Sequence, residues 1–304
     1  MPSLPQIDFM AHRRVAMAVS VALVLLSLVA IGVRGLSFGL DFTGGVLVEI
    51  GFDQDMEPEG VRVLLERAGY EDSVVQNFGD ASTLLVRMPT QEGRDQASLG
   101  NALLALVKAE HGSADLRRID FIGPVVGEEL REQGGIAVLV ALAVVMLYIM
   151  FRFTGKFSVG AVVALVHDIA IAVGAFALFG WSFDLSVLAA MLAVIGYSLN
   201  DTIVVSDRIR ENFRVLRRSS PIEVVNTSLN QTLGRTLVTS FTTLLVLVSL
   251  LLVGGEQLRG FAAALTIGVV VGSYSSIYVA ATTLLLLKID RSSLVVAEQK
   301  DSQV

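Results

Sequence analysis

The sequence predicts a membrane α-helical protein with six transmembrane helices and one α+β domain inserted between the first and second helices. Hydrophobic residues make up 53% of the chain and charged residues only 17%, which is too apolar for a soluble protein of this length. The apolar residues also gather in runs of roughly 20, the number that spans a bilayer as a helix. One long polar segment, 36–134, separates the first run from the others.

Four of the runs contain no charged residue. They lie between Arg14 and Arg34, Glu132 and Arg152, Arg235 and Glu256, and Arg259 and Lys288. Two further runs span a membrane only if they tolerate internal polar residues. The predicted helices are 15–34, 135–151, 157–179, 185–206, 235–253 and 261–287. Because the first run is longer than a signal-peptide core and no A-x-A site follows it, we expect an uncleaved anchor.

The distribution of Lys and Arg predicts the orientation of these helices. The loop after 206 carries five arginines, whereas the connection 180–184 has no basic residue. This pattern places both termini in the cytoplasm. The predicted parts are the N-terminus with the first helix (1–35), an extracytoplasmic, periplasmic domain (36–134), helices two to six (135–288) and a cytoplasmic tail (289–304).

The segment 36–134 has the pattern of a small α+β domain. Its predicted order is strand, helix, strand, strand, helix, strand, at 46–52, 57–68, 73–78, 82–88, 95–111 and 115–122. A turn around Gly79-Asp80 separates the middle strands and indicates a hairpin. This order is that of a ferredoxin-like split βαβ domain.

Asp201 is the most informative residue, because it lies where the run 185–206 should still be in lipid. A carboxylate at that depth costs about 3 kcal/mol on insertion scales. It is tolerated if it faces other helices, finds a partner or carries a proton. One interpretation is a structural bond within the bundle, or an early helix end that leaves Asp201 in water. The functional interpretation is a carboxylate that binds and releases a proton.

Arg235 is the expected partner of Asp201. It begins the predicted helix 235–253 on the cytoplasmic side, and Thr239 lies one turn further along the same face. The alternative is an arginine whose side chain extends to the membrane interface. If Asp201 and Arg235 pair, the pair should weaken when Asp201 takes up a proton.

Other polar residues of the predicted helices are His167, Asp168 and Asn200. The side chains of His167 and Asp168 point about 100° apart on a helix, so they need not act together. They are either packing residues or part of a cavity. Since the three histidines are scattered and the chain has no cysteine, we expect no metal site and no disulfide.

Three glycine motifs suggest close packing or turns. Gly39–Gly45 contains Asp41, Gly44 and Gly45, but no Gly-Lys-Ser/Thr follows it, so a phosphate-binding P-loop is excluded. Gly123, Pro124 and Gly127 precede the second predicted helix and form either a hinge or a turn. Gly268 and Gly272 make a small-xxx-small face that permits close packing with a helix of this chain or of a partner.

These segments, taken together, resemble the SecF family of bacterial protein-export membrane proteins, a branch of the SecD/SecF family that is similar to the RND superfamily. The resemblance rests on five segments in order: Gly39-Leu-Asp-Phe-Thr-Gly-Gly45, Gly123-Pro-Val-Val-Gly-Glu-Glu-Leu130, His167-Asp168, the stretch 196–212, and Arg235-Thr-Leu-Val-Thr-Ser240. It covers nearly the whole chain except the two ends. It implies that the six helices form one half of an RND-type unit.

The resemblance also implies a function and partners. The chain would act with SecD on the SecYEG channel, with YajC as a further partner, and use the proton gradient to promote late translocation and release of preproteins. Protons would be the coupling ion, with no other cofactor and no enzymatic activity. In the family, the residues at the positions of Asp201 and Arg235, and less firmly Thr239, are implicated in proton transport. The location would be the bacterial inner membrane. The chain would contact the lipid bilayer and would bind no nucleic acid.

Three other functions compete with protein export. Half of an RND-like exporter of small molecules or lipids would use the same membrane chemistry, but such exporters carry two six-helix halves. An intramembrane aspartyl protease would need Gly-x-Gly-Asp around Asp168 or Asp201, and neither residue has it. A structural scaffold for SecD, in which Asp201 is inert, stays open.

Overall fold

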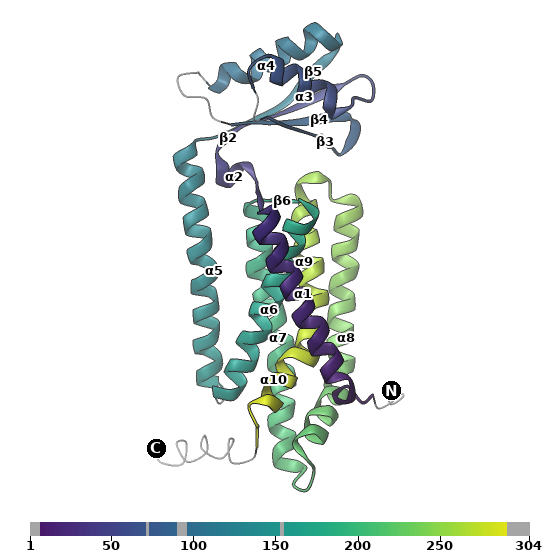
Figure 1. Ribbon diagram of the computed structural model, residues 1–304. Helices are drawn as coiled ribbons and strands as arrows, with labels where there is room; N and C mark the ends of the chain where they lie inside the picture. Colours follow the sequence, from purple (N-terminus) through teal and green to yellow (C-terminus); the bar gives the residue numbers. More distant parts are fainter. Residues whose placement is uncertain (1–6, 71–72, 90–95, 153–154, 291–304) are drawn as a thin grey trace.

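The computed structural model describes residues 7–70, 73–89, 96–152 and 155–290, and the expected tail 289–304 lies outside these residues from position 291 onward. Figure 1 shows a bundle of long helices with a smaller α+β unit at one end. Six helical segments of the described chain are long and apolar enough to cross a membrane. The expected six-helix membrane fold is therefore confirmed.

The long helices carry the labels of Figure 1. They are α1 (Arg13–Arg34), preceded by the 3-10 helix η1 (Met10–His12), α5 (Pro124–Arg152), α6 (Gly155–Phe179), α7 (Leu185–Val215), α8 (Pro221–Val253), and a last span made of α9 (Glu256–Ser275), the π-helix η2 (Ser276–Ala280) and α10 (Ala281–Leu286).

Three helices are at least nine residues longer than predicted. Helix α5 begins at Pro124 instead of 135, α7 ends at Val215 instead of 206, and α8 begins at Pro221 instead of 235. The predicted helix ends were placed where the uncharged runs end. A helix can continue beyond the lipid, because polar residues there also adopt helical conformation. At the start of α8, Ser220 and Glu223 form a capping box, which satisfies backbone N–H groups at the helix end.

The α+β unit has the predicted order of elements. They are β2 (Gly45–Phe52), α3 (Pro58–Arg67), β3 (Val74–Phe78), β4 (Asp80–Met88), α4 (Gln96–His111) and β5 (Ala114–Ile122). The sheet order is β3-β4-β2-β5, and all its neighbouring strands are antiparallel. Gly79 has a φ of 79° at the β3–β4 turn, a left-handed conformation that glycine adopts without a Cβ clash.

One face of this sheet is covered by the two helices. Alternate residues of β2, namely Val46, Val48 and Ile50, are fully buried, as the period of two in a strand requires. They belong to the same cluster as Val61 of α3 and Leu103 of α4. This cluster is separate from the clusters of the long helices.

A short segment not predicted from the sequence joins the α+β unit to the bundle. It consists of β1 (Ser37–Phe38) and α2 (Leu40–Thr43), and β1 pairs in parallel with β6 (Ser182–Phe183) in the α6–α7 connection. The Asp41 carboxylate accepts a hydrogen bond of 3.0 Å from the backbone N–H of Leu185, the first residue of α7. The glycine-rich motif thus holds the start of α7.

The motif at 123–130 forms the start of α5. Pro124 begins α5, and Gly127 lies in its first turn. A Cβ on Gly127 would come within 2.8 Å of the Gly44 nitrogen, and a Cβ on Gly45, whose φ is 126°, would meet the Met88 carbonyl oxygen at 2.4 Å. These glycines are required because two backbone segments pass close to each other.

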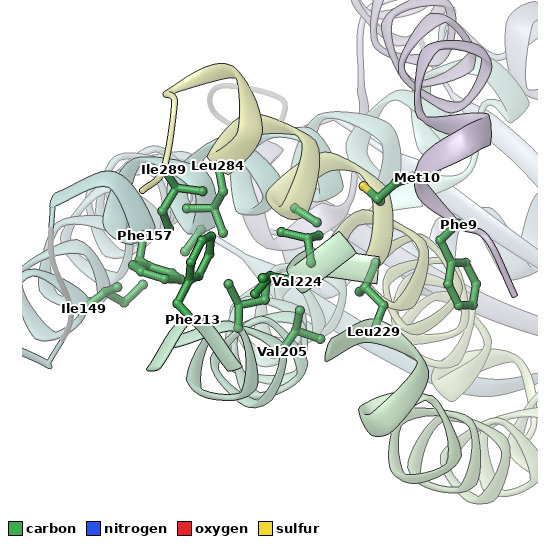
Figure 2. Close-up of a cluster of buried hydrophobic side chains, with 14 of the residues drawn as sticks. Phe9, Met10, Ile149, Phe157, Val205, Phe213, Val224, Leu229, Leu284 and Ile289 are labelled. Carbon is green, nitrogen blue, oxygen red and sulfur yellow. The ribbon is translucent and has the colours of Figure 1, made fainter. Parts of the chain in front are cut away.

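The cluster with the most buried apolar side chains lies at those ends of the helices that are far from the sheet. Figure 2 shows Phe157, Phe213, Val224 and Leu284 from α6, α7, α8 and α10 in this cluster. Helices α7 and α9 approach more closely than ordinary side chains allow. A Cβ on Gly268 would lie 2.1 Å from a Val194 methyl carbon, and one on Gly272 would lie 3.0 Å from the Ser198 Cβ. The small-xxx-small face of α9 therefore packs within this chain, on α7.

We expect Gly268→Ala to destabilise the bundle by about 1–3 kcal/mol, the usual cost of overpacking, because the β-branched Val194 has little freedom to move. The measurement is the midpoint of thermal unfolding in detergent. Gly135→Ala in α5 is the matched control, since nothing lies within 4 Å of its added Cβ. Equal midpoints for the two variants would show that α7 and α9 are not in close contact.

We expect Asp41→Ala to lower the unfolding midpoint by removing the acceptor for the Leu185 N–H. The loss of a helix-terminal cap costs about 1 kcal/mol. The chain has a single tryptophan, Trp181, next to β6, so its fluorescence reports on this junction. Asp53→Ala is the control, because Asp53 is exposed in a connection. An unchanged fluorescence transition in Asp41→Ala would contradict the assigned bond.

Candidate functional site

Asp201 lies inside the bundle, on a side of α7 that other helices cover. Its side chain is 3% exposed, and its Oδ2 has no hydrogen-bond partner among the described residues. Helix α7 continues 14 residues beyond it, to Val215. Asp201 is therefore neither at an early helix end nor in open water, and one of its carboxylate oxygens is free to accept a proton or a donor.

The register of α7 against α8 defines what lies at the level of Asp201. The two helices are antiparallel neighbours, and the Asn212 amide donates to the Ser228 hydroxyl at 2.8 Å. At the other end, the Tyr197 hydroxyl donates to the Ser240 hydroxyl at 3.2 Å. Between these two contacts, Asp201 falls opposite the turn that contains Arg235 and Thr236.

Arg235 and Thr239 do not bind the Asp201 side chain directly. No ion pair within 4.0 Å joins Asp201 to Arg235 among the described residues, although Arg235 is near enough to act on the carboxylate electrostatically. The Thr239 hydroxyl donates to the backbone carbonyls of Arg235 and Thr236, at 3.1 and 3.0 Å. The three predicted residues share one level of the bundle without forming a closed network.

Two buried threonines lie beside Asp201 in sequence and register. The hydroxyl oxygens of Thr202 and Thr236 are buried and, like Asp201 Oδ2, have no partner within the described chain. Three neighbouring positions with unsatisfied buried oxygens are unusual, because such atoms normally pair with protein or ordered water. Sequence reasoning missed both threonines, since a threonine in an apolar run carries no distinctive signal.

Arg235 and Asn200 face outward from the described bundle. Both side chains are exposed, although they lie within the spans Pro221–Val253 and Leu185–Val215. An arginine that faces lipid at this depth is costly. This face of α7 and α8 is therefore suited to contact with another protein surface.

His167 and Asp168 lie together, in contrast to the expected separation of about 100°. Neither is exposed by more than 6%, and His167 Nδ1 lies 2.9 Å from Asp168 Oδ1. The other carboxylate oxygen accepts hydrogen bonds from Ser198 of α7, at 2.5 Å, and from Ser275 of α9, at 2.8 Å. Rotation about the side-chain bonds lets adjacent residues meet, which helical spacing alone does not reveal.

Apart from the cluster around Asp168, a row of hydroxyl groups links α7, α8 and α9. Tyr197 donates to Ser240, which lies 2.6 Å from the hydroxyl of Ser273. Serines recur at 273 and 275 of α9 and at 276, where η2 begins, and this density in a membrane helix was the available signal for the row. Among the described residues, no group of three His, Asp or Glu side chains could hold a metal ion.

Two family profiles match the chain. The profile described as "Protein export membrane protein SecD/SecF, C-terminal" matches residues 103–290, more than half of the chain. The profile described as "SecD/SecF GG Motif" matches residues 29–56, which include β1, α2 and the Asp41 contact.

Curated relatives are similar along nearly their whole length. The protein translocase subunit SecF of Pseudomonas aeruginosa is 49% identical over 298 residues, which are 97% of this chain and 96% of that protein. The subunit of the same name from Vibrio alginolyticus is 45% identical, over 95% of this chain and 92% of that protein.

Two solved structures share the fold. The crystal structure of SecDF, a translocon-associated membrane protein from Thermus thermophilus, matches with a TM-score of 0.86 and 38% identity over 95% of this chain. A crystal structure of SecDF in a super-membrane-facing form matches with a TM-score of 0.70 and 37% identity. This chain spans 39% and 40% of those two chains. On the profiles and the relatives together, the chain belongs to the SecD/SecF family of protein-export membrane proteins.

Proposed function

We propose that this chain is the SecF-type subunit of a bacterial protein translocase, which uses the proton gradient to promote late translocation and release of preproteins. The relatives with identities of 45–49% are named protein translocase subunit SecF. The observation that carries the proton coupling is Asp201, a buried carboxylate in a membrane span with one oxygen unpartnered in the described chain. An ionisable side chain inside a membrane span is costly, and its presence therefore points to a functional site.

The proposed coupling uses the level of the bundle that Asp201 shares with Arg235, Thr236 and Thr239. With Asp201 ionised, the nearby Arg235 attracts the carboxylate. Proton uptake removes this attraction, so that the α7–α8 contact loosens. One charge that crosses 100 mV supplies about 2.3 kcal/mol, which is enough to shift a two-state equilibrium by a factor of about 50.

The proposed partners follow from the outward-facing polar residues and from the length of the relatives. Arg235 and Asn200 are exposed on one side of the bundle, and the matched SecDF chains are more than twice as long as this chain. We assign this side to SecD, which would supply the other half of an RND-type unit. The SecYEG channel, YajC and the preprotein are the further partners of this proposal.

The proposed orientation puts both termini in the cytoplasm of a bacterium and the unit 36–134 on the periplasmic side of the inner membrane. The Arg-rich α7–α8 connection supports this orientation. The order β-α-β-β-α-β and the sheet order β3-β4-β2-β5 support a ferredoxin-like unit. In this arrangement, protons are the coupling ion, and the chain catalyses no chemical reaction.

The test replaces Asp201 in cells that carry no other copy of the gene, at matched membrane levels of this protein and SecD. Asparagine keeps the size and polarity of the side chain but does not titrate. We expect precursors of exported proteins to accumulate in Asp201→Asn to the level of a deletion strain, as measured by pulse-chase labelling.

Asp207→Asn is the matched control, because it makes the same change six residues further along α7. Asp207 is half-buried and lies 3.4 Å from Arg152 in an ion pair near the helix end, where a small cost is usual. We expect normal export in this variant. Normal export in Asp201→Asn would leave Asp201 a structural role and favour the scaffold function.

A further inference from the structure

The carboxylate of Asp168 lies at the junction of three helices and is fully buried. Its Oδ1 contacts His167 on α6, and its Oδ2 accepts from Ser198 on α7 and Ser275 on α9. Oδ2 is the acceptor for two hydroxyls, and Oδ1 lies 2.9 Å from a ring nitrogen that donates to it in one tautomer of His167, an arrangement that suits an ionised carboxylate. This cluster is separate from the level of Asp201 and Arg235.

The charge of Asp168 is balanced by no permanent cation. Within the described residues, no Lys or Arg forms an ion pair with it, and His167 is the titratable group in direct contact. The other groups around the pair are hydroxyls: Tyr274, whose ring stacks on His167; Tyr278, which contacts Tyr274; and Ser20 of α1, which donates to Tyr274. A buried charge without a counter-charge is costly, so a proton on His167 would compensate it.

The ring of His167 has one nitrogen available for that proton. With Asp168 ionised, its carboxylate can only accept, so Nδ1 carries the hydrogen of the 2.9 Å contact. Nε2 then holds a lone pair, and this atom is buried without a partner among the described residues. A neutral histidine with a donor at one nitrogen and an unused acceptor at the other is arranged to take up a proton.

We propose that His167 and Asp168 form a second proton-exchanging site in the helical bundle, with Nε2 of His167 as the atom that accepts the proton. A proton binds to the Nε2 lone pair, and no other bond is broken. The charge of the pair changes from −1 to 0, and the imidazolium stays bonded to the carboxylate through Nδ1–H. This site is additional to the proposed function of Asp201, and the evidence for it does not depend on that function.

The irregular end of α9 gives the buried site a means of exchange. Ser275, which donates to Asp168, is the last residue of α9, and the π-helix η2 begins at Ser276. A π-helical turn interrupts the regular hydrogen-bond ladder of a helix, and such turns often accompany functional sites. A movement at this turn would separate Ser275 from Asp168 and open the site to proton exchange.

The pair also has a physical connection to Asp201. Ser198 donates to Asp168 and lies three residues before Asp201 on α7, so both side chains lie on neighbouring positions of one helix face. When His167 becomes charged, it neutralises the Asp168 carboxylate, so the hydrogen bonds from the hydroxyls to this carboxylate weaken. One of them joins Ser198 on α7 to Asp168 on α6, one helical turn from Asp201.

The experiment is ¹⁵N solid-state NMR of the full chain in liposomes, with only histidine labelled. The chain has three histidines, and the signal that persists in a chain carrying His12→Gln and His111→Gln belongs to His167. Between pH 8 and pH 5, we expect this signal to change from one bare and one protonated nitrogen to two protonated nitrogens. In Asp168→Asn, the bare nitrogen should persist to pH 5, because the carboxylate that stabilises the imidazolium is absent.

Two results would overturn the proposal. One is a bare Nε2 throughout this pH range in the unaltered chain, and the other is a doubly protonated ring that does not change with pH. Both results come from the chain without a change at Asp168, so they stand even if Asp168→Asn fails to fold. Ser275→Ala is the matched variant, since it removes one donor but keeps the charge, and we expect His167 to titrate in it.

Discussion

The close packing of α9 on α7 is the constraint on which the rest of the bundle depends. Gly268 and Gly272 let the two backbones approach until no space is left for a Cβ at Gly268. At this distance, the short hydroxyls of Ser198 and Ser275 reach the same carboxylate oxygen of Asp168. Larger side chains at the glycines would separate the helices and leave the buried Asp168 side chain without its hydroxyl donors, which costs about 1–3 kcal/mol.

The two buried aspartates both lie near hydroxyl groups but differ in whether these groups bond to them. Asp168 receives two serine hydroxyls and a histidine, whereas Asp201 lies near Thr202 and Thr236, whose oxygens have no partner in the described chain. The first aspartate is satisfied and the second is not. The two carboxylates therefore differ in their hydrogen bonding, although both lie within the same helical bundle.

Periodicity and charge predicted much of the fold, because lipid imposes simple rules. A run of about 20 apolar residues spans the bilayer, and the alternation in β2 identifies a strand with one buried face. The ends of α5, α7 and α8 were wrong, because a helix does not stop where lipid stops. The small elements β1, α2 and β6 were missed, because two to four residues give no periodic pattern.

The candidate site was predictable only where a residue was unusual for its surroundings. Asp201 and Arg235 are conspicuous in apolar runs, and whether they act in proton transfer stays a prediction. Thr236 and Ser275 are ordinary residues of a membrane helix, and only the packing of three helices makes them neighbours of a carboxylate. The contact between His167 and Asp168 depends on side-chain rotamers, which helical spacing does not specify.

Helix α7 also provides the mechanical link between the membrane and the α+β unit. Its first residue is bonded to Asp41 of α2, and α2 leads directly into β2, one of the two central strands of the sheet. From Leu185 to Asp201 is 16 residues, or about 24 Å of helix. In the proposed coupling, a shift of α7 caused by proton uptake at Asp201 would be carried along this close-packed length to the Asp41 contact. Because a Cβ on Gly127 would come within 2.8 Å of the Gly44 nitrogen, α2 is also packed against the start of α5, and the sheet is connected to both α7 and α5.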